Sequence, residues 1–279
     1  MKKLFYLQKY TDKRISYEDI TERNTIVFKS NPKLYSGYGY CDTEGNPLPL
    51  AYKLDEYGFR NEVTYQNGTY IALGCSDTFG TGNKIEHRWS NLLSKHYNKD
   101  IINLGIPGGS IKSCYRVLKT YTEQYTPKKV YILIPSPFRS EYSIYSEDRG
   151  LQYVQIGPSF HEALTDEISY LKTFTEELFT RLYTVKANLE IEHFGYLEAI
   201  KGLCASKNIE LIGMPNLIFN DFKPLNLTSQ QKADIAPGYD ITHLGPKYHE
   251  YIANYMISLT SRDSSKVVNY SENVWDNCL

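Results

Sequence analysis

Residues 69–82 read TYIALGCSDTFGTG, and this stretch decides the fold. Its first five residues are apolar or β-branched, the composition of a buried strand. The strand runs into a Gly-Cys-Ser turn at 74–76, and a helical pattern follows from about His87. A strand that delivers a hydroxyl to a glycine-flanked turn can expose a nucleophile at the carboxyl edge of a sheet. Ser76 is therefore the first candidate site residue.

The spacing of this turn excludes a phosphate-binding P-loop. That motif requires Gly, four residues and then Gly-Lys-Ser/Thr. Here the fifth residue after Gly74 is Phe79, and Gly80 is followed by Thr81 instead of lysine. A glycine-rich turn after a strand is also typical of an ordinary strand-to-helix connection, so a functional interpretation depends on the other loops.

Composition narrows the classes of function. The 279 residues are enough for one large α/β domain with embellishments or for two small ones. With 31 basic and 32 acidic residues the net charge is −1, which argues against nucleic acid or an anionic membrane as partner. A small-molecule or glycan ester fits this charge better. The 5 cysteines include no Cys-x-x-Cys pair, which argues against a zinc site and a disulfide framework.

The N-terminus predicts no secretory signal peptide. The apolar run after Lys2 and Lys3 is interrupted by Gln8 and Lys9 before it reaches the required length. No stretch approaches the roughly 18 apolar residues of a membrane span. We therefore expect a cytoplasmic protein, with a virion component as the alternative.

Strand and helix patterns alternate along the chain. Apolar runs predict strands at 69–73, 100–105, 129–135 and 209–215. Amphipathic patterns predict helices at 87–97, 110–125, 164–182, 191–204 and 246–259. This order is typical of a flavodoxin-like, doubly wound parallel sheet in a three-layer α/β/α fold. Residues 142–160 are expected to form a loop.

Right-handed crossovers place the loops after all parallel strands at one edge of the sheet, where such folds bind ligands. Ser76, Gly105 and the loops at 135–141 and 234–245 are thus expected around one crevice. We divide the chain into a loop-rich extension at 1–54, an α/β domain at 55–262 and a tail at 263–279. The extension, with a candidate strand at 25–28, is either a packing segment or an arm for viral-particle or homo-oligomer contacts.

The loops after the strands resemble the sequence blocks of the SGNH/GDSL hydrolase family, over roughly residues 55–262. Residues 74–78, GCSDT, resemble the first block, Gly-Asp-Ser-Leu-Thr, with Ser76 in the place of the nucleophile. Asn103-Leu104-Gly105, followed by PGGS at 107–110, resembles the second and puts Gly105 at an oxyanion-hole glycine. Asp240 and His243 match the last block, Asp-x-x-His. These motifs are similar to those of divergent family members encoded by marine bacteriophages. In those members a Gly-Phe-Arg segment, like residues 58–60 here, also precedes the first strand.

The resemblance implies a flavodoxin-like fold and an esterase, lipase or carbohydrate deacetylase activity. By this resemblance, His243 is the general base that takes the proton of Ser76, and Asp240 orients the imidazole. The backbone N–H groups of Ser76 and Gly105 would donate to the oxyanion. The resemblance implies no metal or organic cofactor.

One block departs from the family pattern. Where the family has Gly-x-Asn-Asp, residues 134–139 read IPSPFR, so the asparagine that donates to the oxyanion is missing. The loss of one such donor costs about 10²–10³ in turnover. The hydroxyl of Ser136 or the guanidinium of Arg139 can replace it. Alternatively, Arg139 pairs with Glu141 and only holds the loop.

The combined interpretation is a serine esterase that cleaves a small acyl ester, an O-acetyl group of a carbohydrate, through an acyl-enzyme. One alternative is a catalytically weak or inactive binding or structural module, such as a virion component. Another is a carbohydrate O-acyltransferase that uses the same intermediate. The remaining candidates are expected to be structural: Cys75, Asp77, Cys114, His161, His193 and His249.

Overall fold

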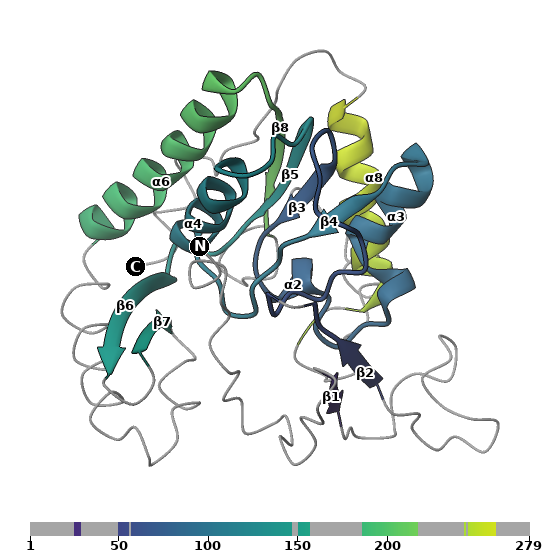
Figure 1. The fold of residues 1–279 in the computed structure, drawn as a ribbon, viewed down its shortest axis with the longest axis horizontal. Helices are drawn as coiled ribbons and strands as arrows, with labels where there is room; N and C mark the ends of the chain where they lie inside the picture. The colour runs from purple at the N-terminus through teal and green to yellow at the C-terminus, as the bar shows by residue number, and fades with distance from the viewer. Residues whose placement is uncertain are drawn as a thin grey trace.

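The computed structural model describes residues 25–28, 50–55, 57–146, 150–156, 186–216, 243 and 245–260. The centre of this part of the chain is a 4-stranded sheet in the order β4-β3-β5-β8 (Figure 1). The strands span Tyr70–Leu73 (β3), Ile101–Asn103 (β4), Lys129–Ile134 (β5) and Glu210–Pro215 (β8), and all of their pairings are parallel. The predicted strands are confirmed. Their order across the sheet, with the second strand of the chain beside the first and then the third and fourth, matches the first four strands of a flavodoxin-like sheet.

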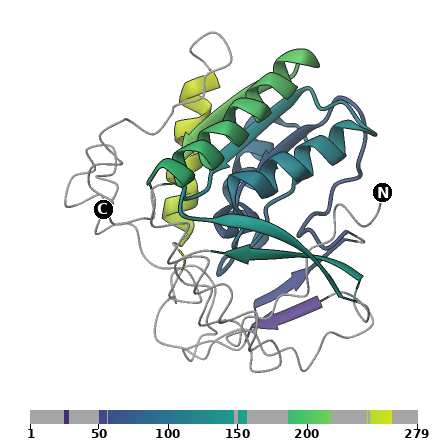
Figure 2. The same ribbon diagram turned by 90° about the vertical axis from the view of Figure 1, so that its left-hand side faces the viewer.

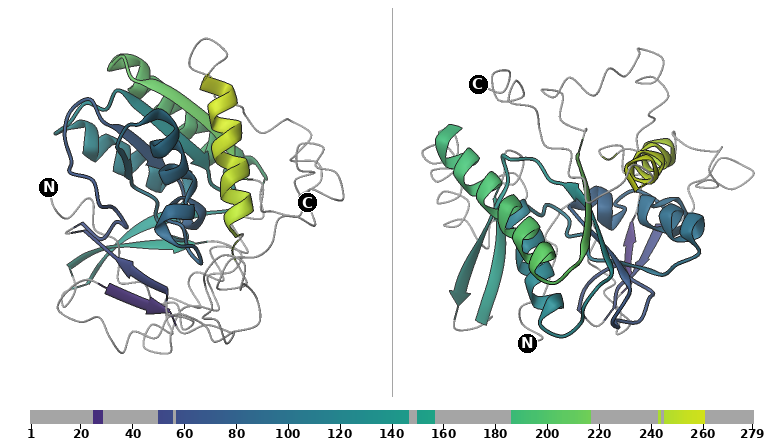
Figure 3. Two further views of the ribbon diagram at one scale, coloured as in Figure 1. Left: turned by 90° about the vertical axis from the view of Figure 1, so that its right-hand side faces the viewer. Right: turned by 90° about the horizontal axis from the view of Figure 1, so that it is seen from above.

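Helices cover both faces of the sheet (Figures 1 and 3). On one face lie α4 (Ile111–Thr122) and α6 (Lys186–Ser206), and on the other α3 (Trp89–Tyr97) and α8 (Pro246–Thr260). Successive residues of β5 alternate between the two cores: Val130 and Ile132 face α4 and α6, whereas Tyr131 and Leu133 face α3 and α8. Burial on both faces explains the continuous apolar runs of the strands. The predicted three-layer fold is confirmed.

The helix boundaries follow from local sequence. The Ser110 hydroxyl accepts the N–H of Ser113 at 3.2 Å, and the Ser113 hydroxyl accepts the N–H of Ser110 at 3.1 Å. This capping box starts α4 at the predicted place. Pro246 occupies the first position of α8, where its missing N–H costs no helical hydrogen bond. Cys114 lies in the core as predicted, and burial raises the pKa of its thiol.

The prediction of a loop at 142–160 is wrong for most of its length. Strands β6 (Ser140–Ser146) and β7 (Gly150–Ile156) pair in an antiparallel hairpin there. Figure 2 shows the hairpin lying beneath α4 and α6. Tyrosine, serine and glutamine interrupt the aliphatic residues of both strands, so the strand pattern does not stand out from a polar loop.

Two other expectations concern the extension and α6. The candidate strand at 25–28 is confirmed as β1 (Thr25–Phe28), which pairs with β2 (Leu50–Lys53) in an antiparallel arrangement. Ile191, the first residue of the helix predicted at 191–204, is 73% exposed. The buried side of α6 instead carries His193, Leu197, Ile200 and Cys204. The predicted helix at 164–182 and the tail at 263–279 lie outside the described residues.

Within the described ranges, no helix has the length and apolar character needed to cross a membrane.

Candidate active site

The candidate site lies where the sheet changes its winding direction. The chain moves outward from β3 to β4 on one side and from β5 to β8 on the other, so the switch point lies between β3 and β5. Ligands of doubly wound folds bind at the carboxyl ends of the strands at this point. Ser76 follows β3 directly, as the first residue of the short helix α2 (Ser76–Phe79).

Two glycines allow the backbones of this region to approach closely. A Cβ atom on Gly74 would lie 2.1 Å from Thr78 Oγ1 and 2.8 Å from the carbonyl oxygen of Leu133. A Cβ on Gly105 would lie 2.3 Å from the backbone nitrogen of Phe79. The loops that follow β3 and β4 therefore touch backbone to backbone, which explains the glycines of the first two sequence blocks.

Asn103 connects three elements beneath the turn. Its side-chain nitrogen donates to the carbonyl oxygen of Thr78 at 2.6 Å and to Ser90 Oγ at 2.8 Å. Its side-chain oxygen accepts the N–H of Gly105 at 3.1 Å. The predicted oxyanion donor at Gly105 is thus engaged inside the protein, and it can serve an oxyanion only by sharing or exchanging this bond.

Ser76 itself is nearly enclosed, with 4% of its surface exposed. Its carbonyl oxygen accepts the N–H of Gly80 at 2.8 Å and of Thr81 at 2.9 Å, so α2 closes after one turn. Gly80 ends this turn with φ at +81°, a left-handed conformation that glycine adopts without strain. The turn therefore presents the Ser76 side chain from a tightly fixed backbone.

Of the predicted base and its orienting acid, the structure describes only His243. The His243 side chain is half-buried, whereas Asp240 lies outside the described residues. Burial lowers the pKa of His249 to about 3, and the charges on Arg88, His243 and Arg60 act in the same direction.

His249 in turn contacts the loop that follows Ser76. Its Nδ1 accepts the N–H of Trp89 at 3.2 Å, so the neutral ring carries its proton on Nε2, which lies 3.1 Å from the side-chain amide of Asn83. The contact with Trp89 supplies an acceptor for one of the first N–H groups of α3, which have no acceptor within the helix. His249 is therefore a buried, neutral residue that joins α8 to α3, in agreement with its predicted structural role.

The loop after β5 contains the two proposed substitutes for the missing asparagine. The Ser136 hydroxyl accepts the N–H of Phe138 at 3.2 Å, and the Ser136 carbonyl oxygen accepts the N–H of Arg139 at 3.3 Å. Ser136 is buried and Arg139 is half-buried. Glu141 is the residue with which Arg139 was alternatively expected to pair. Its carboxylate accepts hydrogen bonds from Arg116, from Nε at 2.6 Å and from Nη2 at 2.8 Å.

Sequence reasoning missed a buried polar chain beside Ser76. Asn216, directly after β8, donates from its side-chain nitrogen to Asp77 Oδ2 at 2.7 Å and to Cys75 Sγ at 3.4 Å. Its side-chain oxygen accepts the hydroxyl of Tyr248 at 2.8 Å. Asp77 does lie in the first turn of α2, but its carboxylate points into this network. A polar residue at the carboxyl end of a predicted strand was the available signal for Asn216.

Two buried arginines hold the far end of the turn that carries Ser76. Arg60 Nη1 donates to the carbonyl oxygens of Gly80 at 2.7 Å and Asn83 at 2.8 Å. Arg88 Nη1 donates to the carbonyl oxygens of Arg60 and Phe79. Guanidinium groups suit this position because the last carbonyl oxygens of a helix carry partial negative charge. Arg60 belongs to the Gly-Phe-Arg segment noted in the sequence.

No protein-family model matches the sequence, and no curated protein matches it. Among solved structures, the fold is similar to a member of the lipolytic protein G-D-S-L family from Veillonella parvula DSM 2008. The identity is 13% over 70% of this chain and 99% of that chain, with a TM-score of 0.34. The psychrotrophic esterase EstA from Pseudoalteromonas sp. is 15% identical over 70% of this chain and 98% of that chain, with a TM-score of 0.35.

An acetyl xylan esterase, Est2A from Butyrivibrio proteoclasticus, is 12% identical over 77% of this chain and 68% of that chain, with a TM-score of 0.33. These structural neighbours are esterases and lipolytic proteins of the SGNH/GDSL type at low identity. At such TM-scores the similarity is coarse, so the fold class rests on the strand order and helix layers described above.

Proposed function

We propose that this protein is a serine esterase that removes a small acyl group, an O-acetyl group of a carbohydrate, through an acyl-enzyme on Ser76. The observation that carries the proposal is the position of Ser76, on a tight turn at the switch point of the sheet. His243, the matching base in the sequence pattern, stands shortly before α8, and His249 of that helix contacts the loop after Ser76.

The proposed reaction has two steps. Ser76 Oγ attacks the ester carbonyl carbon while neutral His243 takes the hydroxyl proton. The tetrahedral intermediate collapses, the carbon–oxygen bond to the sugar breaks, and the imidazolium gives its proton to the leaving alkoxide. Water then attacks the acyl-enzyme through the same base, which releases the carboxylic acid and returns the proton to Ser76. Asp240 holds the imidazole in the required tautomer.

The enclosure of Ser76 supports a small acyl group. A residue that is 4% exposed admits an acetyl group more readily than a long chain. We expect hydrolysis of 4-nitrophenyl acetate to exceed that of 4-nitrophenyl octanoate. O-acetylated xylan and mannan oligosaccharides are suitable first glycan substrates, because acetylated polysaccharides carry small esters on a neutral polymer.

A fluorophosphonate probe tests the proposal. Its phosphorus is attacked only by an activated serine, and fluoride leaves as the adduct forms. We expect wild-type protein to be labelled on Ser76, as identified by peptide mass spectrometry. Ser76→Ala should abolish the labelling, and His243→Ala should reduce it by at least about 10²-fold, the lower end of the usual general-base contribution of 10²–10⁴.

Matched controls come from α3. Ser94→Ala removes a hydroxyl and His96→Ala removes an imidazole, both within α3 and away from the candidate site. Both variants should leave the labelling of Ser76 unchanged. Absence of labelling on Ser76, under conditions where a known serine esterase reacts, would reject the esterase proposal.

A second candidate function is a binding or structural module, such as a virion component, that keeps the fold without efficient catalysis. The specific observation in its favour is that one predicted oxyanion donor is engaged inside the protein. The Gly105 N–H donates to the side-chain oxygen of Asn103 at 3.1 Å. This module predicts no probe labelling together with retained binding to the acetylated oligosaccharides.

A further inference from the structure

Helix α8 is tied to the nucleophile turn by two separate sets of buried polar contacts. The first runs from Asp77, in α2, through Asn216 to Tyr248 on α8. Asn216 donates to Asp77 Oδ2 at 2.7 Å and accepts the Tyr248 hydroxyl at 2.8 Å. Each of these side chains belongs to a residue that is 1% exposed, so water cannot replace the contacts.

The direction of these hydrogen bonds is fixed by chemistry. A carboxylate only accepts, so the amide nitrogen of Asn216 must face Asp77 and the amide oxygen must face Tyr248. The Tyr248 hydroxyl must then be the donor. Such a chain tolerates one arrangement, which holds α2, the end of β8 and α8 at fixed spacing.

The second tie comes from the next residue of α8. His249 faces the side chain of Asn83 through Nε2 at 3.1 Å and accepts the N–H of Trp89 through Nδ1 at 3.2 Å. Asn83 ends the loop that begins after α2. Tyr248 and His249 therefore reach the beginning and the end of the segment that carries Ser76. We call Asp77, Asn83, Asn216, Tyr248 and His249 the α8 clamp.

We propose that the α8 clamp positions His243 against Ser76, with Tyr248 and Asn216 as positioning residues for the proton transfer. This inference rests on the proposed function of the same site. α8 begins at Pro246, shortly after His243 in the chain, so a shift of the start of α8 moves the imidazole. A misplacement of about 1 Å can cost 10²-fold in rate, because proton transfer needs hydrogen-bond geometry.

Tyr248→Phe tests the clamp by removing one hydroxyl. With 4-nitrophenyl acetate, we expect kcat to fall on the order of 10-fold and KM to stay within about 2-fold, because the acyl-binding surface is unchanged. The rate of fluorophosphonate labelling of Ser76 should fall by the same factor. Tyr255→Phe, also on α8 but outside the clamp, is the control and should change neither quantity.

A donor–acceptor exchange provides the rescue. Asp77→Asn alone keeps an acceptor for Asn216, because the amide oxygen at 77 can accept the same bond, so kcat should change little. Asn216→Asp alone sets two carboxylates together and should lower kcat. In Asp77→Asn/Asn216→Asp the carboxylate at 216 accepts both from the amide at 77 and from Tyr248. We expect kcat to recover to within about 3-fold of wild type, as a double-mutant cycle with strong coupling requires.

The outcomes separate the two claims. If wild-type Ser76 is labelled but Tyr248→Phe keeps wild-type kcat, the clamp is wrong and the proposed function stands. The clamp is also wrong if the loss of kcat in Tyr248→Phe equals the unfolded fraction measured by circular dichroism at the assay temperature. If wild-type Ser76 is not labelled at all, the proposed function fails and the clamp fails with it.

Discussion

Gly105 lies where a single methyl group cannot be placed. A Cβ there would meet the backbone of Thr78 and Phe79 at 2.7 Å and 2.3 Å, and backbone cannot turn aside as a side chain can. Gly105→Ala should therefore lower the free energy of unfolding by about 1–3 kcal/mol, the usual cost of overpacking. It should also slow the labelling of Ser76, because α2 must move. Urea denaturation and probe kinetics measure the two effects.

Gly202→Ala is the matched control for this change. Gly202 lies within α6 and a Cβ there would meet nothing within 4 Å. Alanine should raise the free energy of unfolding by about 0.5–1 kcal/mol, because glycine is unfavourable in a helix interior. Equal changes in the free energy of unfolding for the two substitutions would contradict the close approach of the loops after β3 and β4.

Two buried histidines make the stability of the protein depend on pH. Burial lowers the pKa of His193 from 6.5 to about 4 and that of His249 from 6.5 to about 3. The unfolded chain binds these protons as pH falls through about 6.5, but the folded chain does not until the lower values. Stability should therefore fall by about 2 kcal/mol per imidazole between pH 7 and pH 5, with no contribution above that window.

His193→Gln isolates this effect from the titration of carboxylates. Urea denaturation at pH 7 and pH 5 should show a difference about 2 kcal/mol smaller than in wild type. His96→Gln, in an exposed position of α3, should retain the wild-type difference. An unchanged pH dependence in His193→Gln would contradict the neutral state of this side chain.

At the residue scale, the sequence predicted what local chemistry determines. The Ser76 turn and the starts of the helices near residues 110 and 246 all depend on a few neighbouring residues. The contact between Asp77 and Asn216 could not be predicted, because it joins residues 139 positions apart and depends on the sheet order. The roles of Ser76, Asp240 and His243 stay predictions.

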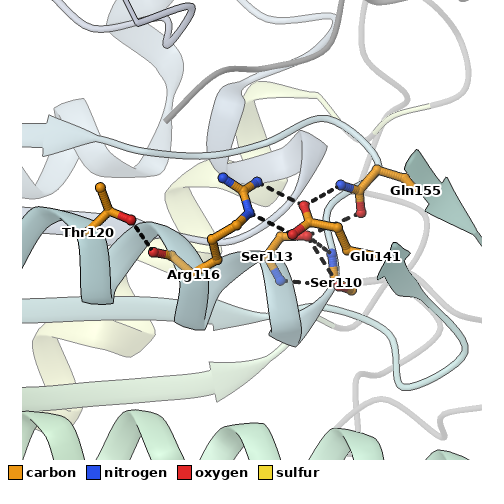
Figure 4. A network of polar contacts seen from close by, with 6 residues as sticks. All are labelled: Ser110, Ser113, Arg116, Thr120, Glu141 and Gln155. Atoms are coloured by element: carbon orange, nitrogen blue, oxygen red, sulfur yellow. Dashed lines mark hydrogen bonds and ion pairs between the residues drawn. The ribbon is translucent and has the colours of Figure 1, made fainter. Parts of the chain in front are cut away.

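Among the elements, the hairpin β6–β7 shows why short strands rich in polar residues are hard to predict. Its attachment to α4 is polar, as Figure 4 shows: Arg116 points at Glu141, and Gln155 approaches the same carboxylate from β7. Gln155 donates to Glu141 at 2.7 Å and accepts the Ser113 hydroxyl at 3.1 Å. Hydrophobic periodicity detects the aliphatic strands of the sheet but not an element held by an ion pair.

Removal of one partner from this pair should be costly. The side chains of Arg116 and Glu141 are 13% and 3% exposed, so Arg116→Ala leaves a buried carboxylate without its cation. We expect a loss of about 3–5 kcal/mol in the free energy of unfolding. Arg116→Met/Glu141→Leu should recover most of this loss, because no buried charge remains. A loss below about 1 kcal/mol in the single variant would contradict the network, and urea denaturation distinguishes the cases.

For the whole molecule, Tyr52 links the predicted extension to the site. It is 1% exposed, its ring packs edge-on against Phe79 at 5.4 Å, and its hydroxyl accepts the N–H of Gly82 at 2.6 Å. The guanidinium of Arg60 lies 4.1 Å above the ring. The domain boundary after residue 54 stays a prediction, but a chain that begins at 55 would lack this contact.

Tyr52 variants measure this link. Tyr52→Ala should lower the free energy of unfolding by about 3–5 kcal/mol, as is usual for a buried aromatic residue. Tyr52→Phe removes only the hydrogen bond and should cost about 0.5–1.5 kcal/mol. Both variants should slow the labelling of Ser76, Tyr52→Ala more than Tyr52→Phe, because the loop that follows α2 loses support. Wild-type stability of Tyr52→Ala would mean that the extension is not packed against the nucleophile turn.

The measurement that tests the central claim most directly is to trap the acyl-enzyme. Wild-type protein is mixed with 4-nitrophenyl acetate, quenched in acid within the first turnover, and digested for peptide mass spectrometry. The account predicts one acetyl group on Ser76, a burst of 4-nitrophenol of matching size, and loss of both in Ser76→Ala and His243→Ala. Acetylation confined to lysine side chains, with no adduct on Ser76, would contradict it.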